Sequence, residues 1–305
     1  MKYLKFFLPA IITLGILFVL FSRLEWREVY EVSKGAEKGF LLAALLVILI
    51  AHFLTALRWK EMLKIVDCRI DLRTALRLFF ANLPVAKIVP LYGGEFLRTY
   101  YLKDKVSMTR HGGVIFAGMV LDVLTLAAIS FVGGIILGMK NIYIFSLLAA
   151  VGLIVSLGLA EILRRRVPFK FKSKLDNFFV VFYAAMRNPA VLIKALSFTL
   201  AIWFFVLLFI QFVFFALSAS VSFSAILAIH PVVTLVSLLP ITVWGIGTRE
   251  TVMILLYAGF AEEPIIFAVG LTYSFVGAVL MPVLFLPLSY KTWRKIAHKS
   301  SFFKK

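Results

Sequence analysis

Long apolar stretches separated by short charged loops are the main feature of the chain. Six of these stretches are long enough to cross a bilayer as helices: residues 5–21, 40–57, 112–139, 142–159, 195–217 and 265–288. No small-residue cleavage site follows the first stretch, so it is expected to be a retained helix rather than a signal peptide. The pattern predicts an all-α, polytopic membrane protein with six transmembrane helices.

Two further apolar runs, residues 75–98 and 222–260, are broken by proline, glycine and charge. The first ends in PLYGGEFLR (residues 90–98) and the second contains PITVWGIGTRE (residues 240–250). Unpaired peptide groups and ionised side chains are costly in hydrocarbon, so such segments persist where protein or a wet cavity surrounds them. Each run is predicted to form a re-entrant helical hairpin.

Basic residues are concentrated in alternate loops. The loops after residues 57, 98, 159 and 288 are rich in lysine and arginine, and in the third of these residues 175–186 are predicted to form an amphipathic helix along the headgroups. Because basic loops stay on the cytoplasmic side, both termini are predicted to be cytoplasmic. The first hairpin then enters from the cytoplasm. The second, whose outer flank carries only Glu262 and Glu263, enters from outside.

This topology predicts an inverted repeat. Residues 1–139 form two helices, a cytoplasmic-side hairpin and one helix, and residues 140–290 repeat that series with every direction reversed. Residues 291–305 form a basic cytoplasmic tail. Inverted repeats whose broken helices approach the midplane are typical of transporters.

Composition narrows the class further. Of the 305 residues, 62% are hydrophobic and 16% are charged, which is too apolar for a soluble fold. A net charge of +18 would suggest nucleic acid in a soluble protein, but here the cations lie in loops that face lipid headgroups, so no nucleic-acid partner is expected. Cys68 is the single cysteine, and His52 and His230 have no metal-ligand partner three or four residues away. We therefore expect no metal and no cofactor.

The charged residues of the two broken segments are the candidate chemistry. Arg98 and Arg249 are suited to bind a lipid phosphate, and exposed peptide N–H groups at the tips would assist them. Glu95 and Glu250 have three alternatives: they hold the arginines, contact a cationic headgroup, or accept hydrogen bonds from helix N-termini. Asp122, alone in an apolar helix, is predicted to pair with a basic residue of the first hairpin, Arg98 or Lys87. The tip glycines either bring the backbone close to a ligand or only turn the chain.

Four segments together resemble a known family. They are LRW (residues 57–59), PLYGGEFLR, VLDVL (residues 120–124) and PITVWGIGTRE, in that order and over nearly the whole chain. The family is the flippase-like membrane family, also called the lysylphosphatidylglycerol synthase transmembrane region, the lipid-translocating part of the multiple peptide resistance factor. The resemblance implies that two motif loops lie at the functional centre, and these map onto Gly93, Gly94, Glu95 and Arg98 and onto Gly245, Gly247, Arg249 and Glu250. The supporting residues are Arg58, Asp122, Pro90 and Pro240.

The resemblance implies translocation of phospholipids or polyprenyl-linked lipids between leaflets of the cell membrane. The aminoacyl-transferring members carry a soluble C-terminal domain that does not appear in this sequence, so catalysis by this chain alone is not expected. Two alternatives remain: a membrane-embedded transferase acting on a lipid-linked substrate, and a scaffold for a separate lipid synthase or glycosyltransferase. Membrane lipids are the expected partners, with a lipid-modifying enzyme or a second copy of the chain as further possibilities.

Overall fold

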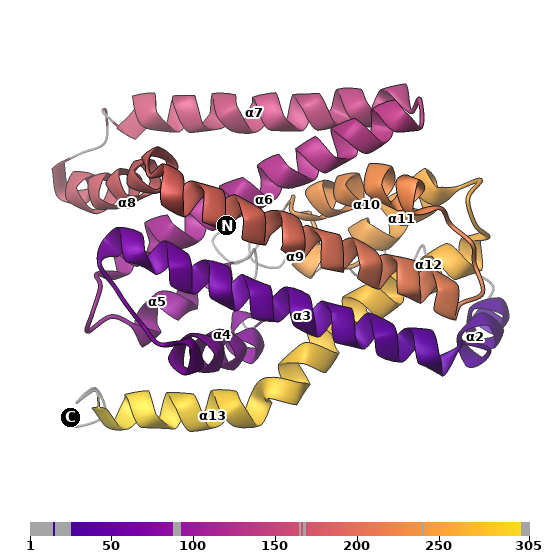
Figure 1. The fold of residues 1–305 in the computed structure, drawn as a ribbon, viewed down its shortest axis with the longest axis horizontal. Coiled ribbons are helices and arrows are strands. Elements are labelled where there is room, and N and C mark those ends of the chain that lie inside the picture. Colours follow the sequence, from indigo (N-terminus) through magenta and orange to yellow (C-terminus); the bar gives the residue numbers. More distant parts are fainter. Residues whose placement is uncertain are drawn as a thin grey trace. The chain divides into compact units, whose positions relative to one another are not determined.

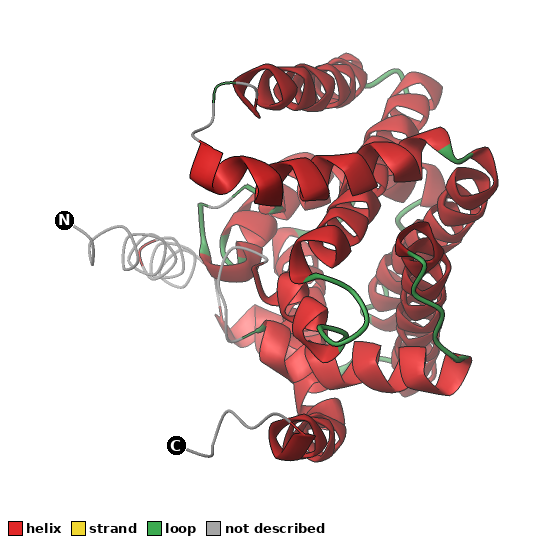
Figure 2. Ribbon diagram, turned by 90° about the vertical axis from the view of Figure 1, so that its left-hand side faces the viewer, coloured by secondary structure: helices red, strands yellow, loops and turns green. Residues whose placement is uncertain are grey.

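The computed structural model describes residue 15 and residues 26–87, 93–164, 166, 169–239 and 241–299. Throughout these residues the protein is helical, with short loops and a single isolated bridge between Ala258 and Ala261, as the red and green ribbon of Figure 2 shows. The predicted first helix, residues 5–21, lies outside the described residues except for Gly15. The all-α fold class is confirmed for the part of the chain that is described.

Five helical segments in the described residues are long and apolar enough to cross a membrane, and Figure 1 labels their helices in chain order. They are Lys38–Val66 (α3, Lys38–Met62, and η1, Leu63–Val66), Met108–Ile136 (α6), Lys140–Arg164 (α7), Pro189–Ala216 (α9) and Glu263–Lys295 (α12, Glu263–Phe275, η4, Val276–Leu280, and α13, Met281–Lys299). Each corresponds to one of the apolar stretches predicted from the sequence. All five begin earlier than predicted and three end later, whereas α6 and α9 end at Ile136 and Ala216, before the predicted residues 139 and 217. The last helix, α13, includes the first part of the predicted basic tail.

The outer surface of these helices is apolar. On α7, the side chains of Leu147, Leu148 and Ile154 are 52%, 63% and 60% exposed. Patches of this kind would aggregate in water, whereas hydrocarbon is their natural surrounding. The exposure pattern therefore agrees with a membrane location.

The two predicted hairpins are broken into short helices. The first consists of α4 (Leu72–Ala86), η2 (Gly93–Leu97) and α5 (Arg98–Tyr101). The second consists of α10 (Phe223–Ser237), η3 (Val243–Gly245) and α11 (Thr248–Tyr257). Capping side chains start both long arms, since Asp71 accepts a hydrogen bond from the backbone N–H of Thr74 at 3.1 Å and Ser222 accepts one from that of Ala225 at 3.3 Å.

The chain divides into two compact units. Unit 1 comprises Met1–Ala51, Val123–Val151 and Trp203–Gly277, and unit 2 comprises His52–Asp122, Gly152–Ile202 and Ala278–Lys305. Unit 1 contains α10, η3 and α11, whereas unit 2 contains α4, η2 and α5. Each unit therefore holds one of the two broken segments.

In unit 1, α10 packs tightly against α6. A Cβ atom on Gly133 would lie 2.7 Å from the backbone nitrogen of Ala228, so only glycine permits this approach. The hydroxyl of Ser130 donates to the carbonyl oxygen of Ala228 at 2.5 Å, and Leu126 and Leu235 contribute to the apolar cluster beside it. Small residues at a helix crossing are a common means of packing helices in membranes.

In unit 2, α13 packs along α4, and the two lie side by side in Figure 1. The rings of Phe80 and Phe285 stack with centroids 4.3 Å apart, and those of Tyr100 and Trp293 stack at 5.5 Å. These aromatic contacts connect both arms of the first broken segment to α13.

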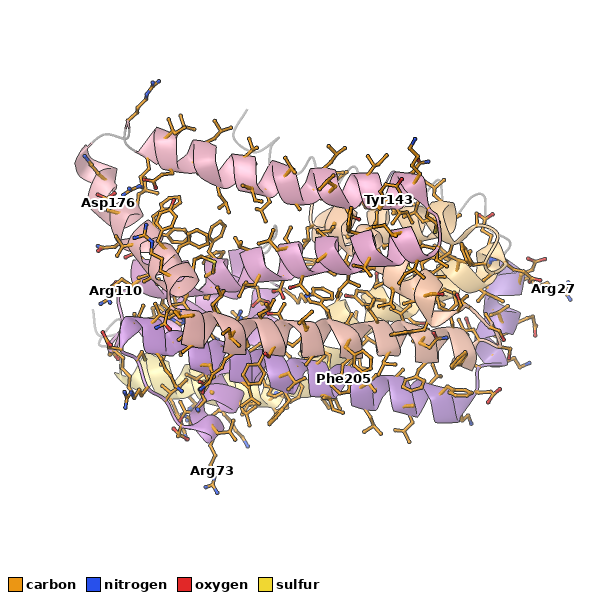
Figure 3. All side chains as sticks on the ribbon, turned by 45° about the horizontal axis from the view of Figure 1, so that its top comes forward. Arg27, Arg73, Arg110, Tyr143, Asp176 and Phe205 are labelled. Carbon is orange, nitrogen blue, oxygen red and sulfur yellow. The ribbon has the colours of Figure 1, made fainter. Side chains whose placement is uncertain are left out.

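Also in unit 2, the predicted amphipathic helix is present as α8 (Phe169–Arg187). Its apolar face includes Phe179 and Phe182, which are buried. Its polar face is joined to the end of α7, where Arg164 pairs with Glu161 at 2.6 Å and with Asp176, labelled in Figure 3. The helix prediction is confirmed, and its contact with headgroups stays a prediction.

Candidate functional site

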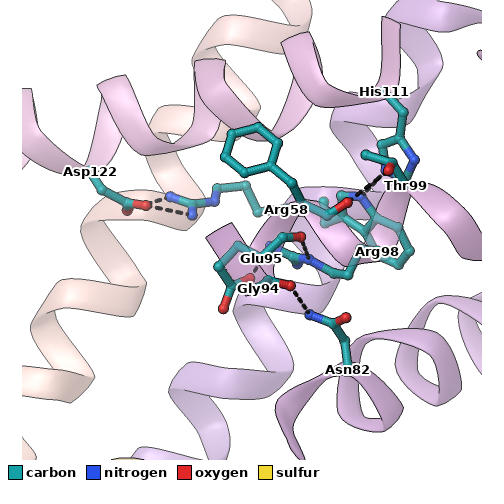
Figure 4. A network of polar contacts seen from close by, with 10 residues as sticks. Arg58, Asn82, Gly94, Glu95, Arg98, Thr99, His111 and Asp122 are labelled. Carbon is teal, nitrogen blue, oxygen red and sulfur yellow. Dashed lines mark hydrogen bonds and ion pairs between the residues drawn. The ribbon is translucent and has the colours of Figure 1, made fainter. Parts of the chain in front are cut away.

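The first motif loop is fixed in unit 2 by a close backbone contact. A Cβ atom on Gly94 would lie 2.0 Å from the carbonyl oxygen of Ala86, so the position accepts only glycine. The side-chain amide of buried Asn82 donates to the carbonyl oxygen of Gly94 at 3.4 Å (Figure 4). Gly93 begins η2, whereas Pro90 lies outside the described residues. The close backbone contact at Gly94 is therefore with the protein itself, and a close approach of the tip glycines to a ligand stays a prediction.

Arg98 is the central cation of this site. Its Nη2 lies 2.6 Å from a carboxylate oxygen of Glu95, three residues earlier, so the predicted glutamate–arginine contact is present (Figure 4). The guanidinium carbon lies 5.5 Å from the ring centroid of Trp59 and 5.3 Å from that of Phe79. The Arg98 side chain is only 8% exposed, and its Nη1 is buried with no hydrogen-bond partner among the described residues. The arginine is therefore held by one carboxylate and two aromatic rings while part of its donor capacity is unused.

A second contact fixes Trp59 itself. Its indole N–H donates to Nε2 of His111 at 2.9 Å, and the two rings stack with centroids 5.6 Å apart. Because Nε2 accepts this bond, it carries no proton, and a neutral His111 has its proton on Nδ1. The aromatic wall of the Arg98 site is thus anchored to α6.

Asp122 and Arg58 form a further ion pair in unit 2, the unit of the first motif loop, between α6 and α3. The two side chains make a bidentate contact at 2.6 and 2.8 Å, and Arg58 also donates to the hydroxyl of Thr199 at 2.8 Å. The sequence predicted Arg98 or Lys87 as the partner of Asp122. That prediction is corrected to Arg58, because Arg58 points from α3 toward Asp122 on α6 while the Arg98 guanidinium turns to Glu95.

The second motif loop, in unit 1, turns through left-handed backbone conformations. Gly245 and Gly247 have φ values of 76° and 88°, and Trp244, which precedes Gly245 within η3, has a φ of 56°. Gly247 is the N-cap of α11, and its backbone N–H donates to the carboxylate of Glu250 at 2.6 Å. Of the alternatives for Glu250, the helix N-terminal role is therefore observed. Pro240 lies outside the described residues.

Arg249 and Glu250 are connected through a serine of α12. Arg249 Nη1 donates to the hydroxyl of Ser274 at 2.7 Å, and that hydroxyl donates to Glu250 at 2.5 Å. The Arg249 guanidinium lies 4.5 Å from the ring centroid of Tyr273. Glu250 is fully buried and Arg249 is partly buried. Sequence reasoning missed both α12 residues, because a serine and a tyrosine in an apolar helix carry no distinguishing signal.

The described residues contain no group of three or more His, Cys, Asp or Glu side chains arranged to hold a metal ion. Each motif loop instead provides hydrogen-bond donors. The first has a buried arginine, and the second has an arginine that lies over an aromatic ring. Both belong to segments that interrupt apolar helices. This combination defines a multi-pass helical membrane protein with charged groups in its broken helical segments.

Residues 6–284 match the family described as the lysylphosphatidylglycerol synthase TM region, and the chain belongs to that family. The resemblance seen in the four motif segments is thereby confirmed. The chain is also similar to the UPF0104 membrane protein MJ1595 of Methanocaldococcus jannaschii, with 26% identity over 277 residues that cover 80% of this chain and 82% of the relative. The match concerns the membrane region of the family.

Proposed function

We propose that this protein translocates a phosphate-bearing lipid, a phospholipid or a polyprenyl-linked lipid, between the two leaflets of the cell membrane. Membership of the family, the five apolar spans and the two charged loops support this proposal. In it, Arg98 and Arg249 contact the lipid phosphate, and the acyl or isoprenoid tails stay in the bilayer. The protein acts as a transporter without catalysis of its own.

The observation that carries the proposal is the unused donor on Arg98. A buried charged donor without an acceptor costs about 1–3 kcal/mol or more, so its retention calls for an explanation. A phosphate oxygen would accept from Nη1 while Glu95 continues to hold Nη2. Arginine is the residue best matched to phosphate, because its planar donors can bind two oxygens at once.

Each unit contains one motif loop with one arginine and one glutamate. We propose that residues 1–139 and 140–290 are inverted repeats whose hairpins enter from the cytoplasm and from outside, with both termini cytoplasmic. Access to the lipid then alternates by movement of one repeat against the other.

Leaflet exchange of labelled lipid in proteoliposomes tests the proposal. Fluorescent phosphatidylglycerol and a labelled polyprenyl phosphate would be offered to the wild type and to Arg98→Gln, Glu95→Gln and Arg249→Ala. The exposed Arg69, changed to glutamine, is the matched control for loss of a cation at the membrane surface. We expect exchange by the wild type and by the control, and loss of exchange in well-folded Arg98 and Arg249 variants.

Charge reversal at Arg249 separates a lipid contact from a structural network. A folded but inactive variant would place Arg249 on the lipid path, whereas loss of the folded protein would make it part of the Ser274–Glu250 network alone. Absence of exchange with both lipids would refute translocation. A lipid-modifying enzyme that co-purifies with the protein would then favour the scaffold, and product formation from a lipid-linked donor would favour the transferase.

A further inference from the structure

We propose that the indole N–H of Trp244 is a hydrogen-bond donor to a phosphate oxygen of the lipid headgroup, next to Arg249. The inference rests on the proposed function and extends it by assigning the second motif loop its own phosphate contact. Trp244 combines a left-handed backbone conformation with a buried indole N–H that has no acceptor among the described residues.

The backbone of Trp244 has left-handed α values, with φ 56° and ψ 20°. This region is strained for residues other than glycine, and asparagine or aspartate are its usual non-glycine occupants. The neighbouring Gly245 also has a positive φ, so glycine would have been the simplest residue at both positions. A large aromatic residue in such a conformation indicates that its side chain is used.

The side chain of Trp244 has an unsatisfied donor. Its Nε1 is inaccessible to solvent and has no hydrogen-bond partner among the described residues. A buried tryptophan N–H normally finds an acceptor. By contrast, the indole N–H of Trp59 donates to His111 at 2.9 Å. Trp244 is thus ready for an acceptor that a ligand would supply.

The neighbouring groups define what that acceptor is. Arg249 Nη2 donates to the carbonyl oxygen of Trp244 at 3.5 Å, so the guanidinium contacts the backbone of the residue that carries the indole. Guanidinium and indole N–H groups are donors only, which excludes a cationic ligand group and favours an oxyanion. Glu250 repels a bound anion only weakly, because its carboxylate already accepts hydrogen bonds from the backbone N–H of Gly247 and the hydroxyl of Ser274. The phosphate of a lipid headgroup is the oxyanion that fits a protein of this membrane class.

Nuclear magnetic resonance of the indole groups tests the contact without any transport assay. The chain has five tryptophans, so protein labelled with ¹⁵N in tryptophan gives five indole signals, and Trp244→Phe assigns one of them. The protein in maltoside micelles would be titrated with short-chain phosphatidylglycerol, with inorganic phosphate, and with a short-chain diacylglycerol that has no phosphate. We expect a saturable downfield shift of the Trp244 proton with phosphatidylglycerol, and none with diacylglycerol.

The three titrations separate the sources of phosphate. An equal shift with inorganic phosphate alone would support the donor role and assign the site to phosphate in general, whereas a shift with the lipid alone assigns it to the headgroup. A Trp244 signal that stays unchanged at saturating phosphatidylglycerol, or moves equally with diacylglycerol, overturns the inference. Because this readout needs no transport, a protein that exchanges no lipid would refute the proposed function and leave the test of Trp244 intact.

Leaflet exchange provides a second test with matched controls. Trp244→Phe keeps an aromatic ring and removes the N–H, and we expect exchange about tenfold slower, the effect of losing roughly one hydrogen bond to a charged group. Asp67 and Ser218 also have positive φ values, 57° and 59°, and lie outside both motif loops. Three separate variants, with glycine in place of Trp244, Asp67 or Ser218, each relieve the backbone strain of a positive φ at one position. Loss of exchange only at Trp244 supports the inference, and wild-type exchange in both Trp244 variants overturns it.

Discussion

Replacing Asp122 with asparagine would leave the guanidinium of Arg58 without its counter-ion. Arg58 is 9% exposed and Asp122 is 23% exposed at the side chain, and their two contacts measure 2.6 and 2.8 Å. Removing one partner of a buried ion pair destabilises a protein by roughly 3–5 kcal/mol, because an uncompensated charge remains. Partial exposure of Asp122 reduces this, and the bond from Arg58 to Thr199 remains. We expect a loss of about 3 kcal/mol in the free energy of unfolding.

Equilibrium unfolding in mixed micelles, followed by circular dichroism, would measure this loss. A double variant, Arg58→Met with Asp122→Leu, removes both charges and should recover most of the stability, since apolar pairs often replace buried ion pairs without cost. Lys64→Met is the control, because it breaks the Glu61–Lys64 pair, whose lysine side chain is 44% exposed. Such a surface pair contributes less than about 1 kcal/mol.

Two results would refute this reasoning. A loss below about 1 kcal/mol for Asp122→Asn would mean that Arg58 finds water or another acceptor easily. If the double variant were as unstable as the single one, the two side chains would stabilise the protein through their packing rather than through their charges.

Further predictions concern packing, pH and topology. Gly94→Ala places a methyl group 2.0 Å from a backbone oxygen and should cost roughly 3 kcal/mol of unfolding free energy, whereas the same change at Gly152, which has nothing within 4 Å, should be neutral or slightly stabilising. Hydrogen bonds from a threonine in the first turn of α4 lower the pKa of Asp71. Its stabilisation is therefore present at neutral pH and lost as the pH falls through that lowered pKa, and an unfolding series between pH 7 and 3 should show a smaller acid effect in Asp71→Ala. Single cysteines replacing Lys103 and Glu262 in a cysteine-free background should react with an impermeant maleimide only from the cytoplasm and only from outside, respectively. Labelling at position 103 from outside would refute the inverted repeat.

The apolar stretches were predictable because hydropathy is a local property. The Glu95–Arg98 contact and the cap formed by Glu250 at Gly247 were also accessible, since both follow from spacings of three residues. In each case the partners lie on the same or adjoining turns, so no knowledge of the packing is needed.

The missed contacts depend on how helices meet. Arg58 and Asp122 are separated by 64 positions, and their pairing follows from the packing of α3 against α6 rather than from any spacing. Ser274 gains its role only because α12 places it beside α11. Gly94 was identified from the sequence as a candidate site residue. The contact that requires glycine there, with the carbonyl oxygen of Ala86, is not specified by the sequence.

The π-helical turn η4, Val276–Leu280, has a consequence for how relatives are compared. A π-helical turn accommodates one residue more than the α-helix would, so it corresponds to a single inserted residue. Each α-helical residue advances about 100°, so a helical wheel drawn from α12 is out of phase by about that angle once it reaches α13. A relative with an unbroken last helix should therefore align with a one-residue gap within residues 276–280. Forcing the two sequences together without that gap would pair lipid-facing positions of one protein with inward-facing positions of the other.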